Sequence, residues 1–294
     1  MATEFNRFLS ENEIYVITAF GLMIIGSCLY IMWDVYKDNR KEFRSKSITY
    51  IIKKLLSREE RVRVEIGIDR NIWNNLTYSE KDAIKNIYFR AKSNGVKFKL
   101  VNEEKIAYPS VVESGGIDYV SGYFVGDEYG SEPELGVAIG GRKWEWFLIL
   151  LHESSHMDQW LEKCPSWVNA TYFKGEDCDV YDLMSKWIQG KEYEKNDIER
   201  IIMSCIDCEL DCEKRTVEKI KQFKLNHIDC YEYTQKANSY IGFYGAIYKK
   251  RMWYKNPPYM DQNVWMRMPK VFLVRDKYFD VEDRYLKIYD QYCF

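Results

Sequence analysis

Residues 152–156 read HESSH, and this stretch is the part of the chain best suited to chemistry. A helix advances about 100° per residue, so His152 and His156 lie on one face, about one turn apart, and can bind the same cation. Glu153 stands beside the first histidine, where its carboxylate can take a proton from a water on that cation. Two histidines, one further ligand and an open water position make a hydrolytic zinc site.

The alternative is a chance pair of surface histidines beside an unrelated glutamate. The chain holds only three histidines, however, and two of them fall in this stretch. Leu148, Leu150 and Leu151 precede the first histidine and predict a largely buried helix. Because isolated buried histidines are costly, this context favours a metal site.

The stretch resembles the zincin metallopeptidases, which carry H-E-x-x-H on a central helix packed under a small sheet. The longer segment HESSHMDQW also resembles uncharacterised metallopeptidase-like proteins encoded by bacteriophages and other large DNA viruses. A looser resemblance, with a sheet before the helix and a helical half after it, covers residues 60–250. It implies an α+β fold with a small sheet over the active helix and a helical C-terminal lobe. It also implies Zn²⁺ as cofactor and a peptide or protein substrate.

Four carboxylates compete for the place of third ligand. In the metzincin subgroup the motif continues to a glycine and a third histidine, but here Gln159 and Glu162 occupy those places. Without that glycine we expect the helix to continue and to carry Glu162 past the metal. Asp211 lies about 200° from Glu209 around a later predicted helix and faces away from its apolar stripe.

Glu209 and Glu213 remain, one turn apart on the buried face of the helix predicted at residues 197–223. Two carboxylates on an apolar stripe need a compensating partner, because an unpaired buried charge is expensive, and a metal ion is such a partner. In gluzincins, the subgroup that the chain resembles here, an acid four residues after the ligand glutamate commonly hydrogen-bonds a ligand histidine. By this resemblance Glu209 binds the metal and Glu213 orients His152 or His156.

An oxyanion that develops during peptide hydrolysis needs a hydrogen-bond donor besides the metal. His227, Tyr240 and Tyr244 follow the predicted third-ligand helix and are the candidates for this role. For the two tyrosines the alternative is a place in the core.

Three cysteines, Cys205, Cys208 and Cys212, fall at spacings of 3 and 4 on one face of the same predicted helix. Disulfides between them are disfavoured, because consecutive turns of one helix rarely give the required geometry. A soft-metal site is one interpretation, and small buried core residues are the favoured one.

Residues 14–33 form a run of 20 residues without a charge, long enough at about 1.5 Å per residue to cross a bilayer core. We expect a transmembrane helix here, after an N-terminal tail at 1–13 and before a basic juxtamembrane linker at 34–60. Basic side chains gather after the run, which predicts a single-pass membrane protein with a cytoplasmic C-terminal domain. The lipid bilayer is then a partner through residues 14–33, and the peptidase domain covers 61–294, with a sheet lobe at 61–160 and a helical lobe at 161–294.

Periodicity predicts the elements of this domain. Residues 61–68 alternate as a half-buried strand, and Thr77 with Glu80 forms a capping box that opens a helix. By resemblance to zincins, the last strand before the active helix, at 135–140, is the candidate peptide-binding edge. The other expected elements are strands at 96–101, 116–126, 134–139 and 271–274 and helices at 180–190, 197–223, 229–253 and 280–292.

The net charge of −2 gives no global field that points to nucleic acid. From the HESSH stretch and the uncharged run at 14–33, the favoured function is a membrane-anchored zinc metallopeptidase in which Glu153 is the general base for a zinc-activated water. The alternative keeps the zincin fold without the activity, as a catalytically silent structural or interaction protein, for example a virion component, with a structural metal.

Overall fold

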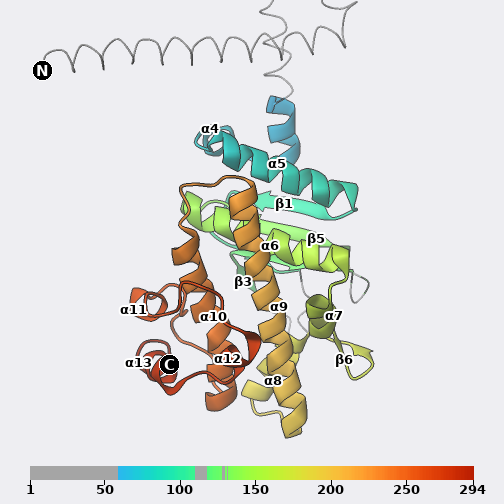
Figure 1. Cartoon of the computed structure of the whole chain (residues 1–294). Helices are drawn as coiled ribbons and strands as arrows, with labels where there is room; N and C mark the ends of the chain where they lie inside the picture. Colours follow the sequence, from blue (N-terminus) through green and yellow to red (C-terminus); the bar gives the residue numbers. More distant parts are fainter. Residues whose placement is uncertain (1–58, 110–117, 128–129, 131) are drawn as a thin grey trace, which may run out of the picture. The chain divides into compact units, whose positions relative to one another are not determined.

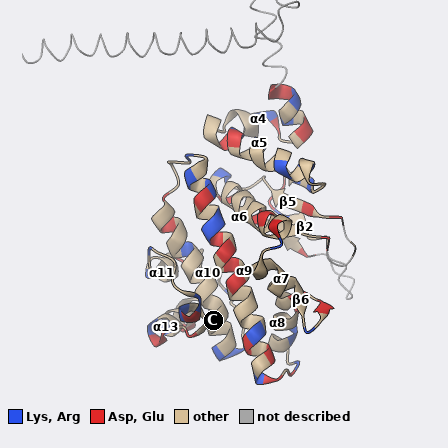
Figure 2. Cartoon of the chain, turned by 45° about the vertical axis from the view of Figure 1, so that its right-hand side comes forward, with Lys and Arg blue, Asp and Glu red and all other residues tan. Residues whose placement is uncertain are grey.

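The computed structural model describes residues 59–109, 118–127, 130 and 132–294 (Figure 1). Residues Val62–Phe294 form one compact unit, which carries the helices α4 to α13 and the strands β1 to β7. Lys and Arg are interspersed with Asp and Glu along its helices (Figure 2).

The strands of a three-stranded sheet precede the three longest helices of the described residues in the sequence. Its order is β1-β5-β4, with β1 (Lys97–Val101) parallel and β4 (Gly122–Val125) antiparallel to the central β5 (Glu134–Ala138). Every residue of β5 is buried, as expected of a central strand covered on both faces. Two short hairpins complete the strands, β2 (Ile106–Ala107) with β3 (Tyr119–Val120) and β6 (Tyr172–Phe173) with β7 (Glu176–Asp177).

The alternation of side chains along β5 divides the sheet into two faces. Leu135 and Val137 join the core shared with α5 (Tyr78–Ser93) and α6 (Lys143–Glu162), so both helices cover one face. Ala138 joins a small cluster with the β2–β3 hairpin on the other face. The α+β arrangement of a small sheet against the HESSH helix thus follows from the sequence pattern.

The predicted capping box is confirmed. The Thr77 hydroxyl accepts the Glu80 amide, and the Glu80 carboxylate accepts the Thr77 amide. A short helix, α4 (Arg70–Asn74), precedes it and is capped by Asp69.

The strand predicted at 61–68 is wrong, because residues 59–66 are helical. Val62 and Ile66 are four apart and both contact the core, whereas Val64 between them is 62% exposed. The spacing of the apolar residues is therefore compatible with a helix as well as with a strand, and the chain forms the helix. Gly67, at φ 83°, ends this helix. The strand predicted at 271–274 is also wrong, since those residues are irregular.

Helices make up the rest of the unit. α6 continues through Gln159 and ends at Glu162, followed by Lys163 in the left-handed region, so the expected continuation of this helix is confirmed. α9 (Lys195–Gln222) is the longest helix of the described residues and packs against both α6 and α10 (Cys230–Lys250). The remaining helices are α7 (Pro165–Thr171), α8 (Val180–Ile188), α11 (Gln262–Trp265), α12 (Arg275–Phe279) and α13 (Asp283–Tyr292).

The predicted fold class included one transmembrane helix, and this prediction is not supported. Within the part of the chain that the structure describes, no helix is both long enough and apolar enough to cross a bilayer. The predicted localisation as a single-pass membrane protein with a cytoplasmic C-terminal domain is therefore not supported. The predicted span at residues 14–33 lies outside the described residues.

The predicted peptide-binding edge at 135–140 is wrong as well. β5 is the central strand, and its backbone groups are already paired with β1 on one side and β4 on the other. The strand that forms the edge next to α6 is β4. Gly122 permits this close approach, because a Cβ there would lie 2.4 Å from Cγ2 of Ile149 on α6.

Replacing Gly122 with alanine is expected to destabilise the protein by about 1–3 kcal/mol, the usual cost of overpacking a close contact. Ile149 is branched at Cβ and cannot move its methyl group aside without shifting α6 or β4. Chemical denaturation of wild type and variant measures the difference. Gly141→Ala is the control, since nothing lies within 4 Å of its added Cβ. Equal unfolding midpoints for the two variants would contradict the close approach.

Candidate metal centre

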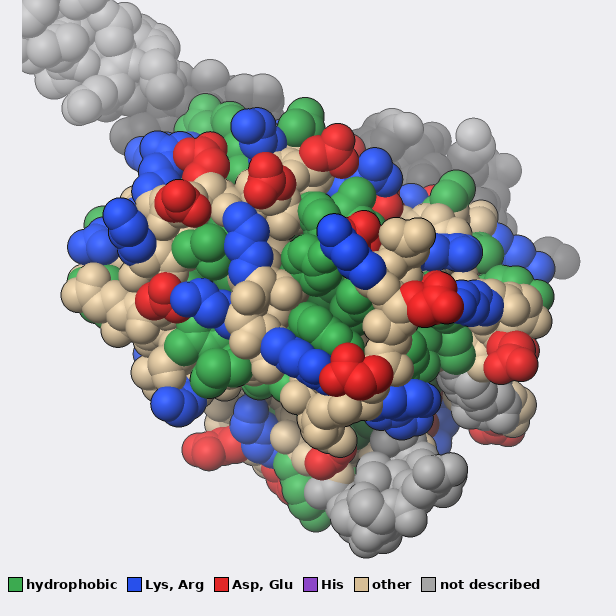
Figure 3. Space-filling view, turned by 90° about the horizontal axis from the view of Figure 1, so that it is seen from below, with side chains coloured by type: hydrophobic (Ala, Val, Ile, Leu, Met, Phe, Trp, Pro, Cys, Tyr) green, Lys and Arg blue, Asp and Glu red, His purple; other side chains and the backbone are tan. Residues whose placement is uncertain are grey.

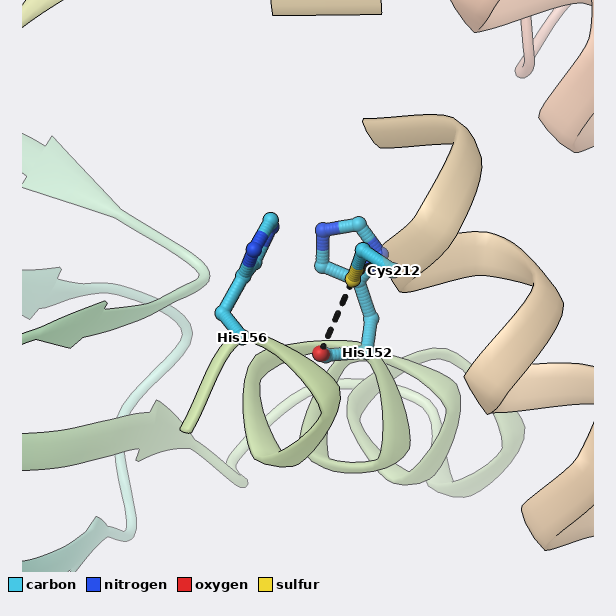
Figure 4. A group of neighbouring side chains, drawn as sticks. All are labelled: His152, His156 and Cys212. Atoms are coloured by element: carbon cyan, nitrogen blue, oxygen red, sulfur yellow. Dashed lines mark hydrogen bonds between the residues drawn. The ribbon is translucent and has the colours of Figure 1, made fainter. Parts of the chain in front are cut away.

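The two histidines of the HESSH stretch lie side by side where α6 faces α9. Their ring centroids are 4.8 Å apart and the ring planes are nearly perpendicular, at 86°. Both rings project from α6 toward the side on which Cys212 of α9 lies (Figure 4). The opposite side of α6 buries Phe147, Leu150 and Leu151 in the core of the sheet, so the pattern of apolar residues turns the histidines to α9. The face of the molecule in Figure 3 shows an apolar centre and no histidine.

Gln159 fixes the orientation and the tautomer of His156. The Gln159 side-chain nitrogen donates to the Cys208 carbonyl and to the Asp211 carboxylate, each at 2.9 Å. Its oxygen therefore faces His156 Nδ1, at 2.7 Å, and Nδ1 must carry the proton. Burial lowers the pKa of His156 to about 3, so the ring is neutral and Nε2 presents a lone pair.

Glu213 holds His152 in the same way. One carboxylate oxygen lies 3.2 Å from His152 Nδ1, and the other accepts the hydroxyl of Tyr233. Burial lowers the pKa of His152, but neighbouring Cys212 and Glu213 more than offset this and raise it. Burial raises the pKa of the Cys212 thiol to about 12. A cation on Nε2 would take the place of the second ring proton, because metal ligands must be deprotonated.

Glu209 faces the free nitrogens of both rings. Its Oε2 lies 3.8 Å from Nε2 of His152 and 3.8 Å from Nε2 of His156. The other oxygen, Oε1, accepts the hydroxyl of Tyr181 at 2.8 Å. Oε2 is buried and has no hydrogen-bond partner among the described residues. Burial raises the pKa of Glu209 to about 7. A buried carboxylate oxygen without a hydrogen-bond partner, close to two ring nitrogens, suits a cation.

Cys212 also belongs to the cluster. One ligand atom from each of His152, His156 and Cys212 lies within 4.8 Å of the others, so these three residues could hold a metal ion. Without one, the thiol donates to the His152 carbonyl at 3.4 Å and lies 3.6 Å from its Nδ1 (Figure 4). Cys205 is buried in the helical core, in agreement with the favoured interpretation of the cysteines, whereas Cys212 has a polar setting.

Glu153 lies on the side of α6 that faces the edge strand. Its carboxylate accepts the backbone amide of Phe124 in β4. Burial raises the pKa of Glu153, and the nearby charge of His152 opposes the rise. The added Cβ at Gly122 would lie 3.3 Å from Cγ of Glu153, so the edge strand and this carboxylate are immediate neighbours.

The candidate oxyanion donors separate into two groups. Tyr240 and Tyr244 share a hydrogen bond of 2.7 Å between their hydroxyls. Burial raises the pKa of each, and the nearby charge of Glu209 adds to the rise. His227 instead pairs with Glu80, at 3.3 Å, and Glu80 also binds the first residue of α6. That end of α6 is about 13 Å along the helix from the HESSH stretch. The structure therefore does not bring His227 to the cluster.

The two other carboxylates considered as ligands have partners elsewhere. Glu162 is exposed and pairs with Arg215 at 2.7 Å. Asp211 accepts from Arg215 and from Gln159, each within 2.9 Å, and so supports His156 only indirectly.

Sequence reasoning missed Gln159, Tyr181 and Tyr233 as parts of the site. Gln159 follows His156 by three residues, which places two helical side chains on one face, so its contact could have been foreseen. Tyr181 and Tyr233 come from α8 and α10, and no spacing within one helix reveals contacts between separate helices.

No family model, no curated protein and no solved structure matches the chain.

Proposed function

We propose that this chain is a zinc-dependent metallopeptidase in which His152, His156 and Glu209 bind the metal. The observation that carries the proposal is the buried Oε2 of Glu209, which has no hydrogen-bond partner among the described residues and lies 3.8 Å from both Nε2 atoms. A buried carboxylate oxygen without a donor is costly, and a dication offsets that cost.

The donor set fits zinc. Two imidazole nitrogens and one carboxylate oxygen are ligands that Zn²⁺ takes in hydrolytic sites, which keep a fourth position open. Each histidine also has its Nδ1 held by a hydrogen-bond acceptor, Glu213 or Gln159, as is usual for metal-bound histidines.

Glu209 is the better third ligand than Cys212 for a geometric reason. Cys212 lies on the Nδ1 side of His152, and that nitrogen is engaged by Glu213. Glu209 faces Nε2 of both rings, the nitrogens that the contacts on Nδ1 leave free for a metal. The Cys212 thiol also has a hydrogen-bond acceptor already, the carbonyl of His152.

A zinc ion held by these residues supplies a Lewis acid that polarises a water molecule and the scissile carbonyl. Glu153 is the general base of the proposal and receives the proton of the attacking water. Its burial favours that role, because a carboxylate with a raised pKa holds the proton better near neutral pH. The Phe124 amide keeps the carboxylate in one orientation. Tyr240 and Tyr244 are the candidate donors to the developing oxyanion.

An extended peptide substrate would pair with the outer edge of β4. Among the described strands β4 has only β5 as a neighbour, so a peptide could add to its other edge, where Glu153 already accepts the Phe124 amide. That edge adjoins Glu153 through Phe124, so a peptide aligned with it would pass beside the proposed base.

One observation favours a second function. Cys212 could serve as a ligand together with both histidines. Thiolate ligands are typical of closed structural zinc sites, and a fully protein-ligated metal has no position for water. In that case the chain is a catalytically silent structural or interaction protein whose metal joins α6 to α9.

Wild-type protein is expected to bind about one zinc ion per chain. Glu209→Gln should abolish binding, because the amide loses the negative charge, whereas Cys212→Ala should keep it. Cys205→Ala is the matched control, since it truncates another fully buried cysteine of the same helix. Equilibrium dialysis with elemental analysis measures all four proteins. Zinc retained in Glu209→Gln and lost in Cys212→Ala would favour the structural alternative.

Glu213→Gln should weaken zinc binding by about 10–100-fold without abolishing it, because Glu213 orients His152 and is not itself a ligand. Competition with a chromophoric chelator measures the dissociation constant. Complete loss of zinc in this variant, with tight binding in Glu209→Gln, would exchange the roles of the two glutamates.

Glu153→Gln should remove peptidase activity by at least about 100-fold while zinc stays bound, since the amide cannot accept the proton. Cleavage of a peptide library, together with the metal content of the same samples, measures both properties. Glu162→Gln, at an exposed carboxylate of the same helix, is the control and should remain active. A wild-type protein that binds zinc and cleaves none of the peptides would argue for the silent alternative.

A further inference from the structure

We propose that Tyr181 is a positioning residue that holds Glu209 by one oxygen, so that only Oε2 is offered to the zinc. This inference rests on the function proposed above. It begins with the unequal surroundings of the two carboxylate oxygens. Oε1 accepts the Tyr181 hydroxyl at 2.8 Å, whereas Oε2 faces the two histidines.

Tyr181 is itself fixed in place. It lies in the first turn of α8, where its backbone amide donates to the side chain of the N-cap residue Asp179 at 2.8 Å. Its ring packs edge-on against Tyr244 of α10, with ring centroids 6.1 Å apart. The hydroxyl therefore reaches α9 from a ring that is held by both its own helix and a third one, and it cannot easily follow a rotation of the carboxylate.

The consequence concerns the number of metal ligands. A free carboxylate can bind a metal through one oxygen or through both. With two histidines, binding through both oxygens of Glu209 would complete four protein contacts and fill the position that a hydrolytic site leaves to water. A hydrogen bond on Oε1 favours binding through one oxygen, because turning Oε1 to the metal would break that bond. Tyr181 thereby keeps the proposed site open.

The test replaces Tyr181 with phenylalanine in the full chain, which removes the hydroxyl and keeps the ring. Tyr248→Phe is the matched control. Tyr248 donates to Glu199 on the same helix at 2.8 Å, but that pair lies ten residues before Glu209 in α9. Far-UV circular dichroism and thermal unfolding of the metal-free proteins verify that both variants are folded.

We expect Tyr181→Phe to bind zinc about 10-fold more weakly and Tyr248→Phe to bind it as wild type does. With Co²⁺ in place of zinc, Tyr181→Phe should show a visible absorption spectrum that differs from that of wild type, because the second carboxylate oxygen of Glu209 would take the place of the water ligand. A role for Tyr181 in packing alone would leave this spectrum unchanged.

The outcomes separate the two proposals. If wild type binds neither zinc nor Co²⁺, the proposed function fails. If wild type binds both metals and Tyr181→Phe matches it in affinity and spectrum, Tyr181 does not position Glu209, and the inference is overturned while the metal site stands. An equal loss of affinity in Tyr248→Phe would also overturn it, because the effect would then be general to the helix.

Discussion

The candidate metal centre depends on two carboxylates, Glu209 and Glu213, that α9 buries against the two histidine rings of α6. A charge taken out of water must be compensated, or the fold loses several kcal/mol. Glu213 is compensated by His152 and Tyr233, and Oε1 of Glu209 by Tyr181. Oε2 of Glu209 is the remaining atom; it has no hydrogen-bond partner among the described residues and lies 3.8 Å from Nε2 of each histidine. The same four-residue spacing on both helices produces this meeting, because each pair of side chains lies one turn apart.

Polar contacts between the facing sides of α6 and α9 fix the position of one helix along the other. The side chain of Lys219 in α9 is 12% exposed, and its amine lies 2.7 Å from both the Asp158 carboxylate and the Ser154 hydroxyl of α6. Ser155 and Thr216 share a further hydrogen bond of 3.0 Å between the same helices. Removing one partner of such a buried pair leaves the other uncompensated, so a slip by one turn would be costly. The register that brings Glu209 to the histidines is thus fixed by residues outside the cluster.

The sequence predicted the elements near the site well because the signals there are local. The HESSH spacing, the capping box at Thr77 and the buried face of α9 each depend on residues within one or two turns. The helices of the described residues do not support the membrane-anchored organisation. Residues 135–140 form no sheet edge, because strand order depends on pairings distant in sequence, which a local pattern does not give. For the same reason no local pattern indicates the contacts of Tyr181 and Tyr233, and His227 pairs with Glu80 and does not reach the cluster.

The place of the cluster along α9 bears on what a metal there would do. The first part of α9, up to Leu210, packs in the core of the helical half, and Ile220 packs in the core shared with the sheet. Glu209 and Glu213 lie where one core gives way to the other.

A bound dication would therefore tie the two cores together, and its binding free energy would add to stability whether or not the site is catalytic. Stabilisation by metal cannot separate an enzyme from a structural protein; the number of protein ligands can, because only an incomplete set leaves room for water. In the proposed site, the hydrogen bonds on Oε1 of Glu209 and from the thiol of Cys212 would both keep that set incomplete, as the proposed catalytic role requires.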